Sequence, residues 1–210
     1  MVDKLFLFLK MSVREKIIFM SMYFYRLRTN VLYRHFCKRM GSRVNIIKPI
    51  KIIPECISFG NDVTILYHGR IEGITEYAGR RYNPNIVFED EVKVQQNLHL
   101  TCAEEIIIGS NTAIAANVTI TDINHRYEDV HIPPEKQPLE TSKVMIGANC
   151  KIYNNTVILP GTNLGRHNIV GANSVVAGEF PDYCVIGGAP AKIIINYNFD
   201  TRTWEKVANR

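Results

Sequence analysis

The sequence lacks the cysteine pattern of a disulfide framework or of a zinc-binding module. Its five cysteines are odd in number, widely spaced and never arranged as C-x-x-C. Small disulfide-rich domains and zinc ribbons both need closely spaced pairs. We therefore expect reduced thiols in a cytosolic protein. The five are Cys37, Cys56, Cys102, Cys150 and Cys184.

The sequence also lacks a hydrophobic run long enough to span a membrane. The apolar stretches at residues 5–9 and 17–25 are separated by charged residues, and neither reaches the required length of about 20 residues. No small-residue cleavage site follows them. We therefore expect neither a transmembrane helix nor a signal peptide.

Acidic residues are scarce in the first 43 positions. This segment holds ten Lys or Arg against only Asp3 and Glu15, whereas the rest of the chain is negative by about three charges. A basic excess confined to one end predicts a local anionic partner, such as a membrane surface. It argues against a protein wrapped by nucleic acid, and we expect no nucleic-acid partner.

What the sequence has in abundance is a repeat of six residues. A period of six fits neither the α-helix nor a simple hairpin meander, but it fits short strands joined by tight corners. We expect three hexads per coil of a triangular prism, with the aliphatic side chains pointing inward. The four runs are Ile47, Ile53, Phe59, Ile65 and Ile71; Phe88, Val94 and Leu100; Ile108, Ile114 and Ile120; and Ile146, Ile152, Ile158, Leu164, Val170 and Val176.

Two further patterns support this prism. Small or β-branched residues lie four places after the aliphatic ones, which suits a narrow interior; they are Thr112, Val118, Cys150, Thr156, Thr162 and Ser174. Asparagines fall at one predicted corner in different coils, where they tolerate left-handed backbone angles and can hydrogen-bond to one another. The predicted asparagine ladder consists of Asn97, Asn117, Asn155 and Asn173.

The repeat resembles that of the hexapeptide-repeat acyltransferases. Ile-Gly-Ala-Asn at 146–149, Val-Gly-Ala-Asn-Ser-Val at 170–175 and Gly-Gly-Ala-Pro-Ala-Lys at 187–192 are similar to the C-terminal half of maltose and galactoside O-acetyltransferases and of O-antigen or capsule acetyltransferases. The resemblance covers about residues 45–195.

The resemblance implies an all-β solenoid, a left-handed parallel β-helix with a short N-terminal helical segment. The handedness comes from the family alone, because the usual crossover preference predicts the opposite hand. We expect a basic amphipathic helical segment at 1–44, the β-helix at 45–195 with a loop at 121–145, and a C-terminal tail at 196–210.

The longest break in the repeat lies between Ile120 and Ile146. A loop of more than 20 residues in a regular solenoid is the first place to look for a site. Histidine is the side chain best suited to take a proton from a hydroxyl near neutral pH, and His125 lies near the start of this loop. In the sugar O-acetyltransferases that the chain resembles, the catalytic histidine likewise follows the last aliphatic residue of a coil by five positions. We predict His125 as the general base, with His131 as the alternative.

Two asparagines are candidates for binding the acceptor. Asn97 lies at the spacing where the family has a substrate-binding asparagine, although it also belongs to the predicted corner ladder. Asn124 immediately precedes the predicted base. The resemblance implies a sugar hydroxyl as the acceptor, in a sugar or lipid-linked oligosaccharide of O-antigen or capsule biosynthesis.

The resemblance implies acetyl-CoA as the donor. Its pantetheine arm would run past Asn154 and Ala172, and the Asn154 N–H would face the thioester oxygen. Lys192 would meet a coenzyme phosphate at the end of the element that contains Gly188 and Ala189. Family members also form homotrimers in which the histidine loop of one chain covers the donor groove of the next.

Residues 3–40 are expected to form one or two amphipathic helices that end near Gly41. One hypothesis is a helical cap over the first coil. The other is an interfacial helix on an anionic membrane. Both can hold at once, and a lipid-linked acceptor would place the protein in the cytoplasm, at the inner face of the cell membrane.

Other functions on this fold stay open. The nearest enzymatic alternative is transfer to the amine of an amino sugar nucleotide, and no residue separates the two. A non-catalytic scaffold is the alternative of another class, which failure to bind coenzyme A would favour. A γ-carbonic anhydrase needs three zinc-binding histidines. The six histidines show no matching spacing, so we expect no metal; they are His35, His68, His99, His125, His131 and His167.

Overall fold

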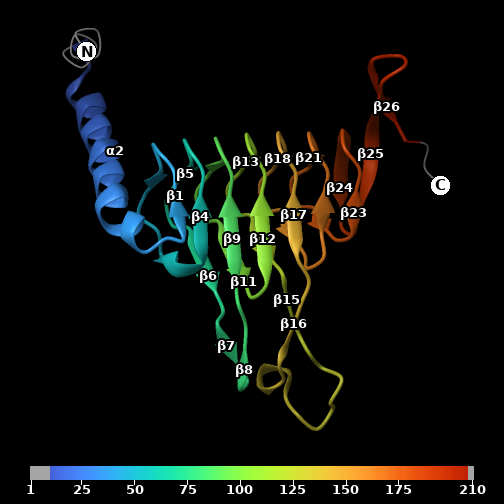
Figure 1. The fold of residues 1–210 in the computed structure, drawn as a ribbon. Coiled ribbons are helices and arrows are strands. Elements are labelled where there is room, and N and C mark those ends of the chain that lie inside the picture. The colour runs from blue at the N-terminus through green and yellow to red at the C-terminus, as the bar shows by residue number, and fades with distance from the viewer. Residues whose placement is uncertain (1–9, 208–210) are drawn as a thin grey trace.

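A computed structural model describes residues 10–207 as three parallel β-sheets, with a helix at one end and an antiparallel hairpin at the other (Figure 1). The chain visits the three sheets, here named A, B and C, in turn and then returns to sheet A. Each circuit makes one coil of a triangular prism. This succession is that of a parallel β-helix, the architecture that the six-residue repeat predicts.

The strands are short because each side of the prism is only a few residues wide. Sheet A consists of β1 (Arg39–Met40), β4 (Ile57–Phe59), β9 (Asn85–Phe88), β12 (Glu105–Ile108), β17 (Val144–Ile146), β20 (Asn163–Leu164) and β23 (Glu179–Phe180). Sheet B consists of β2 (Asn45–Ile46), β5 (Thr64–Ile65), β10 (Lys93–Val94), β13 (Ala113–Ile114), β18 (Lys151–Ile152), β21 (Ile169–Val170), β24 (Cys184–Gly188), β25 (Ala191–Asn198) and β26 (Thr203–Lys206). Sheet C consists of β3 (Lys51–Ile52), β6 (Arg70–Gly73), β11 (His99–Cys102), β14 (Thr119–Thr121), β19 (Val157–Ile158) and β22 (Val175–Val176).

The aliphatic repeat forms the core, as predicted. From Phe59 to Val176 every residue of the predicted runs is at most 2% exposed. Equivalent positions pair between coils: Ile152 lies between Ile114 and Val170, and Ile158 lies between Ile120 and Val176. Each sheet therefore presents one column of apolar side chains to the centre of the prism.

The predicted register is wrong in the first coil. Ile46 and Ile52, not Ile47 and Ile53, pair with the inward residues of the next coil. The reason is the short 3-10 helix at Pro54–Cys56, which adds one residue to the corner before Phe59. Adjacent isoleucines at both positions satisfy the repeat in either register.

The interior is as narrow as the small residues predict, and all six of them are at most 2% exposed. Hydroxyls among them donate to corner carbonyls: Thr112 to Gly147 O at 2.9 Å and Thr156 to Tyr153 O at 2.8 Å. No buried hydroxyl is thus left without a partner at these positions.

The predicted asparagine ladder is confirmed at the corner between sheets B and C. All four asparagines have φ between 60° and 62°. Each side-chain amide donates to the next carbonyl oxygen: Asn97 to Asn117 at 2.8 Å, Asn117 to Asn155 at 3.0 Å and Asn155 to Asn173 at 3.0 Å. The ladder ties the coils together along one corner.

The N-terminal segment contains helix α2 (Val13–Leu32), which begins at a capping box between Ser12 and Glu15. It ends earlier than the predicted stop at Gly41, and a 3-10 turn at Tyr33–His35 leads into β1. The Arg34 guanidinium holds this connection by donating to Met40 O at 3.0 Å and Gly41 O at 2.8 Å. The part of the helix prediction that falls on residues 3–9 lies outside the described residues.

Two of the expected segment boundaries differ from the structure. Parallel strands begin at Arg39 rather than at residue 45, because the short β1 already pairs with β4. The segment expected as a tail at 196–210 contains the end of β25 and all of β26, which pair antiparallel with each other. No helix within residues 10–207 combines the length and the apolar character needed to cross a membrane.

Two antiparallel hairpins interrupt the coils between sheets C and A. The first consists of β7 (Glu76–Tyr77) and β8 (Arg80–Arg81), and the second of β15 (Ile123–His125) and β16 (Leu139–Thr141), with a 3-10 turn at Pro134–Lys136 near its tip. Figure 1 shows both hairpins leaving the same side of the prism. The second is the predicted loop 121–145.

Candidate functional site

A buried carboxylate fixes the base of the hairpin that carries His125. Asp122 is 0% exposed. Its two oxygens accept the backbone N–H groups of Ala103, Glu104 and Glu105, each at 2.8 Å, and the Cys102 thiol at 3.2 Å. These bonds satisfy the corner between β11 and β12, where the aliphatic repeat slips by two residues. Asp122 therefore anchors the point from which β15 leaves the prism.

His125 lies on β15, opposite Leu139 of β16. Within residues 10–207 no side chain or backbone group hydrogen-bonds to its imidazole, and its ring contact is with Tyr77 of the first hairpin. The two ring centroids are 5.3 Å apart, with an interplanar angle of 76°. The edge-to-face arrangement is a favourable aromatic geometry. The first hairpin thus orients the predicted base on the second.

Hydrogen bonds join the two hairpins. The Tyr77 hydroxyl donates to Glu135, at 2.8 Å to its carbonyl and 2.7 Å to its carboxylate, and this bond raises the pKa of the phenol. The Tyr82 hydroxyl accepts from Leu139 N at 2.7 Å and lies 3.1 Å from Leu139 O. The tyrosines therefore hold the tip of the second hairpin at Glu135 and its strand β16 at Leu139, opposite His125.

A pocket of about 300 Å³ lies between the hairpins and the outer face of sheet C. Its floor comes from outward-facing residues of β11 and β14, and its walls come from the hairpins. The Thr101 and Thr119 hydroxyls make no hydrogen bond to any other described residue, so both are free to bind a polar ligand. The lining residues are Ile74, Tyr77, His99, Thr101, Thr119, Thr121, Ile123, His125 and Leu139.

A second histidine, His99, lies on the floor of this pocket. Burial, followed by the nearby Arg70 charge, lowers its pKa. Arg70 Nη1 lies 3.1 Å from His99 Nε2. Because a guanidinium only donates, Nε2 must accept, so the ring proton sits on Nδ1. Arg70 is itself held by an ion pair with the buried Glu72, which also binds Lys51.

The other predicted acceptor residues lie outside this pocket in the same chain. Asn97 is at the ladder corner, at the far edge of sheet C, and its amide is used by the ladder. Asn124 alternates with Ile123 and His125 along β15 and is exposed on the other face of the hairpin. His131 is exposed near the hairpin tip, where its backbone N–H donates to Asp129 at 2.9 Å.

The predicted donor residues line up along the ladder corner in successive coils. Asn154 and Ala172 are exposed there, and Asn154 O accepts from Asn173 N at 3.0 Å. No acceptor among the described residues pairs with the N–H of Asn154 or of Ala172. Gly188 and Lys192 follow where β24 turns into β25, and both are exposed. Two free N–H groups in successive coils fit an extended arm with amides, and the small side chain of Ala172 leaves room for its approach.

His125 and this donor corner occupy opposite edges of sheet C. In the coil that carries the hairpin, four residues separate Asn117 at the corner from Thr121 at the base of β15. At about 3.3 Å per residue this is roughly 13 Å, and His125 lies farther out. Two such groups cannot meet over a thioester within one chain.

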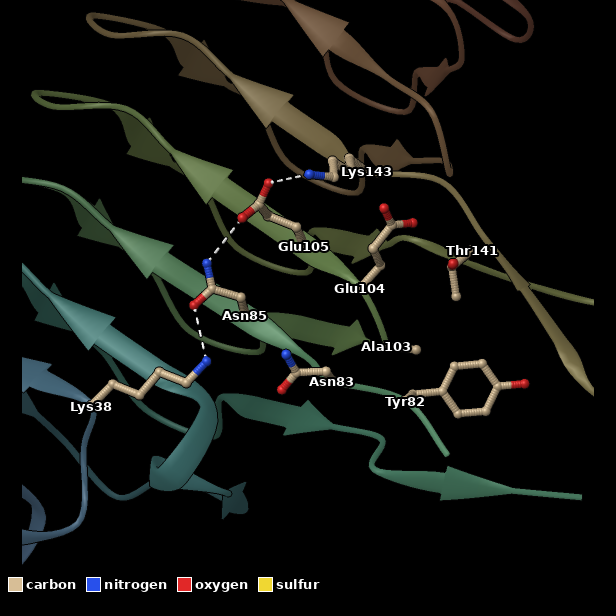
Figure 2. A pocket seen from close by; sticks show the side chains of 9 residues that line it. All are labelled: Lys38, Tyr82, Asn83, Asn85, Ala103, Glu104, Glu105, Thr141 and Lys143. Atoms are coloured by element: carbon tan, nitrogen blue, oxygen red, sulfur yellow. Dashed lines mark hydrogen bonds and ion pairs between the residues drawn. The ribbon is translucent and has the colours of Figure 1, made fainter. Parts of the chain in front are cut away.

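A larger hollow, of about 520 Å³, lies over sheet A on the other side of the hairpins (Figure 2). A chain of bonds crosses it: Lys143 to Glu105 at 3.0 Å, Asn85 to Glu105 at 3.0 Å and Lys38 to Asn85 at 3.2 Å. The bond from Lys143 lowers the pKa of Glu105. No histidine lines this hollow, and the Glu105 carboxylate within it is held in an ion pair with Lys143. We therefore assign the candidate site to the pocket beside His125.

Sequence reasoning missed Tyr77 and His99. A spacing signal for the first hairpin exists: 17 residues separate Ile71 from Phe88, where one hexad would give six. His99 carries no such signal, because its place in the pocket depends on the stacking of β11 on β14. Within the described residues, no group of three or more His, Cys, Asp or Glu side chains is placed to hold a metal ion.

Comparisons with known proteins identify relatives of the chain. Residues 143–178 match the family model "Bacterial transferase hexapeptide (six repeats)". WbbJ of Escherichia coli K12, named for lipopolysaccharide biosynthesis as an O-acetyl transferase, is 44% identical over 58% of this chain and 65% of its own length. The galactoside O-acetyltransferase of the same strain is 32% identical over 49% of this chain and 50% of its own. The matched region thus spans less than two thirds of either relative.

A solved structure shares the fold. A variant of AntD, an N-acyltransferase from Bacillus cereus in complex with dTDP-4-amino-4,6-dideoxyglucose and coenzyme A, matches with a TM-score of 0.64 and 19% identity. The match covers 79% of this chain and 87% of that one. These comparisons confirm that the chain resembles the hexapeptide-repeat acyltransferases, as its sequence predicts.

Proposed function

We propose that the protein transfers an acetyl group from acetyl-CoA to a sugar hydroxyl during the synthesis of a cell-surface polysaccharide such as O-antigen or capsule. The observation that carries the proposal is the position of His125 over a pocket whose floor holds unpaired threonine hydroxyls. Among the relatives, WbbJ, named for O-acetyl transfer in lipopolysaccharide biosynthesis, supports it. The family's left-handed coil is part of the same proposal.

In the proposed reaction, His125 takes the proton of the acceptor hydroxyl as its oxygen attacks the thioester carbonyl carbon. The carbon–sulfur bond then breaks, and the thiolate of coenzyme A leaves with the proton that His125 returns. The free Asn154 N–H supplies the hydrogen bond to the thioester oxygen. In this proposal transfer is direct: neither serine nor cysteine lines the pocket, and its threonine hydroxyls are assigned to binding the acceptor.

The coenzyme is proposed to lie along the ladder corner. Asn154 and Ala172 would contact the pantetheine arm, Gly188 and Ala189 would allow its close approach, and Lys192 would bind a phosphate. The exposed, unpaired N–H groups of this corner support the assignment. Asn97 and Asn124 stay proposed acceptor ligands, as residues of a site that two chains share.

We propose a homotrimer, since His125 and the donor corner lie too far apart to act within one chain. Threefold closure would place the hairpin of one chain over the donor corner of the next. Light scattering on the active enzyme tests whether it is a trimer. A fully active monomer would contradict the proposal. The proposed location is the cytoplasm, at the inner face of the membrane that carries a lipid-linked acceptor.

A thiol-release assay with acetyl-CoA against sugars, nucleotide sugars and lipid-linked oligosaccharides tests the function. His125→Ala is expected to lower kcat by about 10² or more while leaving coenzyme A binding nearly intact. His131→Ala is the matched control, in the same exposed hairpin, and should be far milder. Near-normal kcat in His125→Ala, or acetyl label that stays on the protein without acceptor, would overturn the mechanism.

A second candidate is N-acylation of an amino sugar nucleotide, which the fold shared with AntD favours. The same assay separates the two, because the panel includes amino and hydroxy nucleotide sugars. Failure to bind coenzyme A at all would favour a non-catalytic scaffold.

A further inference from the structure

Helix α2 carries an apolar stripe with alternating spacings of four and three residues. At about 100° per residue, these positions all fall within an arc of roughly 80°. Every member is between 54% and 74% exposed. The stripe consists of Val13, Ile17, Met20, Phe24, Leu27 and Val31.

The stripe is not what holds the helix on the prism. Thr29, which is 0% exposed, lies on the opposite side of the helix, and its hydroxyl accepts from Ile46 N at 3.0 Å. Met22 and Tyr25, on the same side as Thr29, are half-buried. Figure 1 shows the N-terminal end of α2 standing away from the sheets. The helix therefore has an inner face that it uses and an outer apolar face that no described residue covers.

Basic residues flank the stripe on both sides. By helical angle, Arg14 lies about 60° beyond one edge of the stripe and Lys16 about 20° beyond the other. Arg14 forms no ion pair with a described carboxylate. The only acidic residue of α2 is Glu15, whose carboxylate is held by the capping box on the inner side. The outer face is thus apolar along its centre and cationic at its edges.

We propose that the outer face of α2 docks on an anionic phospholipid surface, with the stripe at the level of the acyl boundary and Arg14 and Lys16 among the headgroups. Tyr23, at 61% exposed, widens the apolar face beside Phe24, and aromatic side chains favour this interfacial depth. Opposite charge makes a phosphate surface the favoured occupant.

A second copy of the same helix is the competing occupant, because alternating spacings of four and three also fit a helix–helix seam. The charge of α2 argues against pairing with a second copy of the helix. Identical helices would bring basic borders together, and α2 offers no acidic border to pair with them. The docking is independent of the chemistry at His125, and it would bring the site to a lipid-linked acceptor.

The test is vesicle flotation of the full chain. Wild type is expected to bind phosphatidylcholine vesicles that contain about one third phosphatidylglycerol, to bind pure phosphatidylcholine far less, and to dissociate as salt is raised. Phe24→Glu should lower the partition coefficient about ten- to a hundredfold more than Ser21→Glu. Ser21 is exposed outside the stripe, so both variants have the same net charge and differ only in the stripe.

Three results would overturn the proposal: no binding by wild type, equal binding by the two variants, or a loss of oligomer in Phe24→Glu without an effect on vesicles. The last would assign the stripe to a second copy of the chain. Unchanged melting temperatures exclude unfolding as the cause. Both variants should retain thiol release with a soluble acceptor, so failure here is distinguishable from failure of the proposed function.

Discussion

Replacement of Asp122 by asparagine is expected to loosen the corner that supports the His125 hairpin. The native carboxylate accepts three backbone N–H groups in a fully buried position. An asparagine side chain has a single acceptor oxygen, so its NH₂ group must face at least one of these donors. A buried N–H left without an acceptor costs about 1–3 kcal/mol.

The remaining two bonds also weaken, because hydrogen bonds to a charged group contribute about 1 kcal/mol more than neutral ones. Together the two effects amount to about 3–5 kcal/mol, a large fraction of the roughly 5–15 kcal/mol that stabilises a typical domain. For a chain of this size we expect the melting temperature to fall by about 6–20 °C.

Thermal unfolding at fixed protein concentration gives the global effect, and hydrogen exchange at Ala103, Glu104 and Glu105 gives the local one. Asp182→Asn is the matched control, since exposed Asp182 accepts a single backbone N–H, from Arg166 at 2.8 Å. We expect Asp182→Asn to lower the free energy of unfolding by less than about 1 kcal/mol. Equal stability of the two variants, with unchanged exchange at the corner, would refute the role given to Asp122.

Three further predictions follow from other contacts. Tyr77→Phe, which keeps the ring against His125 but removes the bonds to Glu135, should lower kcat several-fold with little change in coenzyme A affinity; an unaltered kcat would show that the hairpin contact is dispensable. Ile158→Asp places an unpaired charge at a position that is 0% exposed and should unfold the protein. A wild-type melting temperature in this variant would refute the inward position of Ile158. Burial raises the pKa of Cys37 to about 12, and the other four cysteines are buried, so Ellman's reagent at pH 8 should find five thiols only after denaturation. A fast-reacting thiol in the native protein would contradict that expectation.

Most of the prism could be predicted from sequence because a solenoid repeats the same local requirement. Each inward position must be aliphatic and each left-handed corner favours asparagine, so Ile152, Ile158 and Asn155 are recognisable from spacing alone. The register of the first coil could not be predicted, because Ile46-Ile47 and Ile52-Ile53 permit two registers. Only the extra residue in the corner at Pro54–Cys56, a tertiary feature, selects one of them.

The candidate site was less predictable, since the pocket is made of residues that are distant in sequence. His125 could be found because it follows a break in the repeat. Tyr77 comes from a different hairpin, and His99 reaches the pocket only through the stacking of coils. The role of Asp122 depends on a corner about 20 residues earlier, which spacing does not reveal.

The antiparallel hairpin β25–β26 has a consequence for assembly. Sheet B ends on this hairpin instead of on an open parallel strand, and at the other end α2 lies against β2 through Thr29 and Ile46. Stacked coils with two bare ends would template one another end to end, as exposed strand edges do in fibres. A chain cut after Gly188 would leave the edge of β24 bare and should pair with a second copy through that edge, under conditions in which the full chain does not. The hairpin thus ends the stack of coils and prevents another chain from adding to the edge of sheet B.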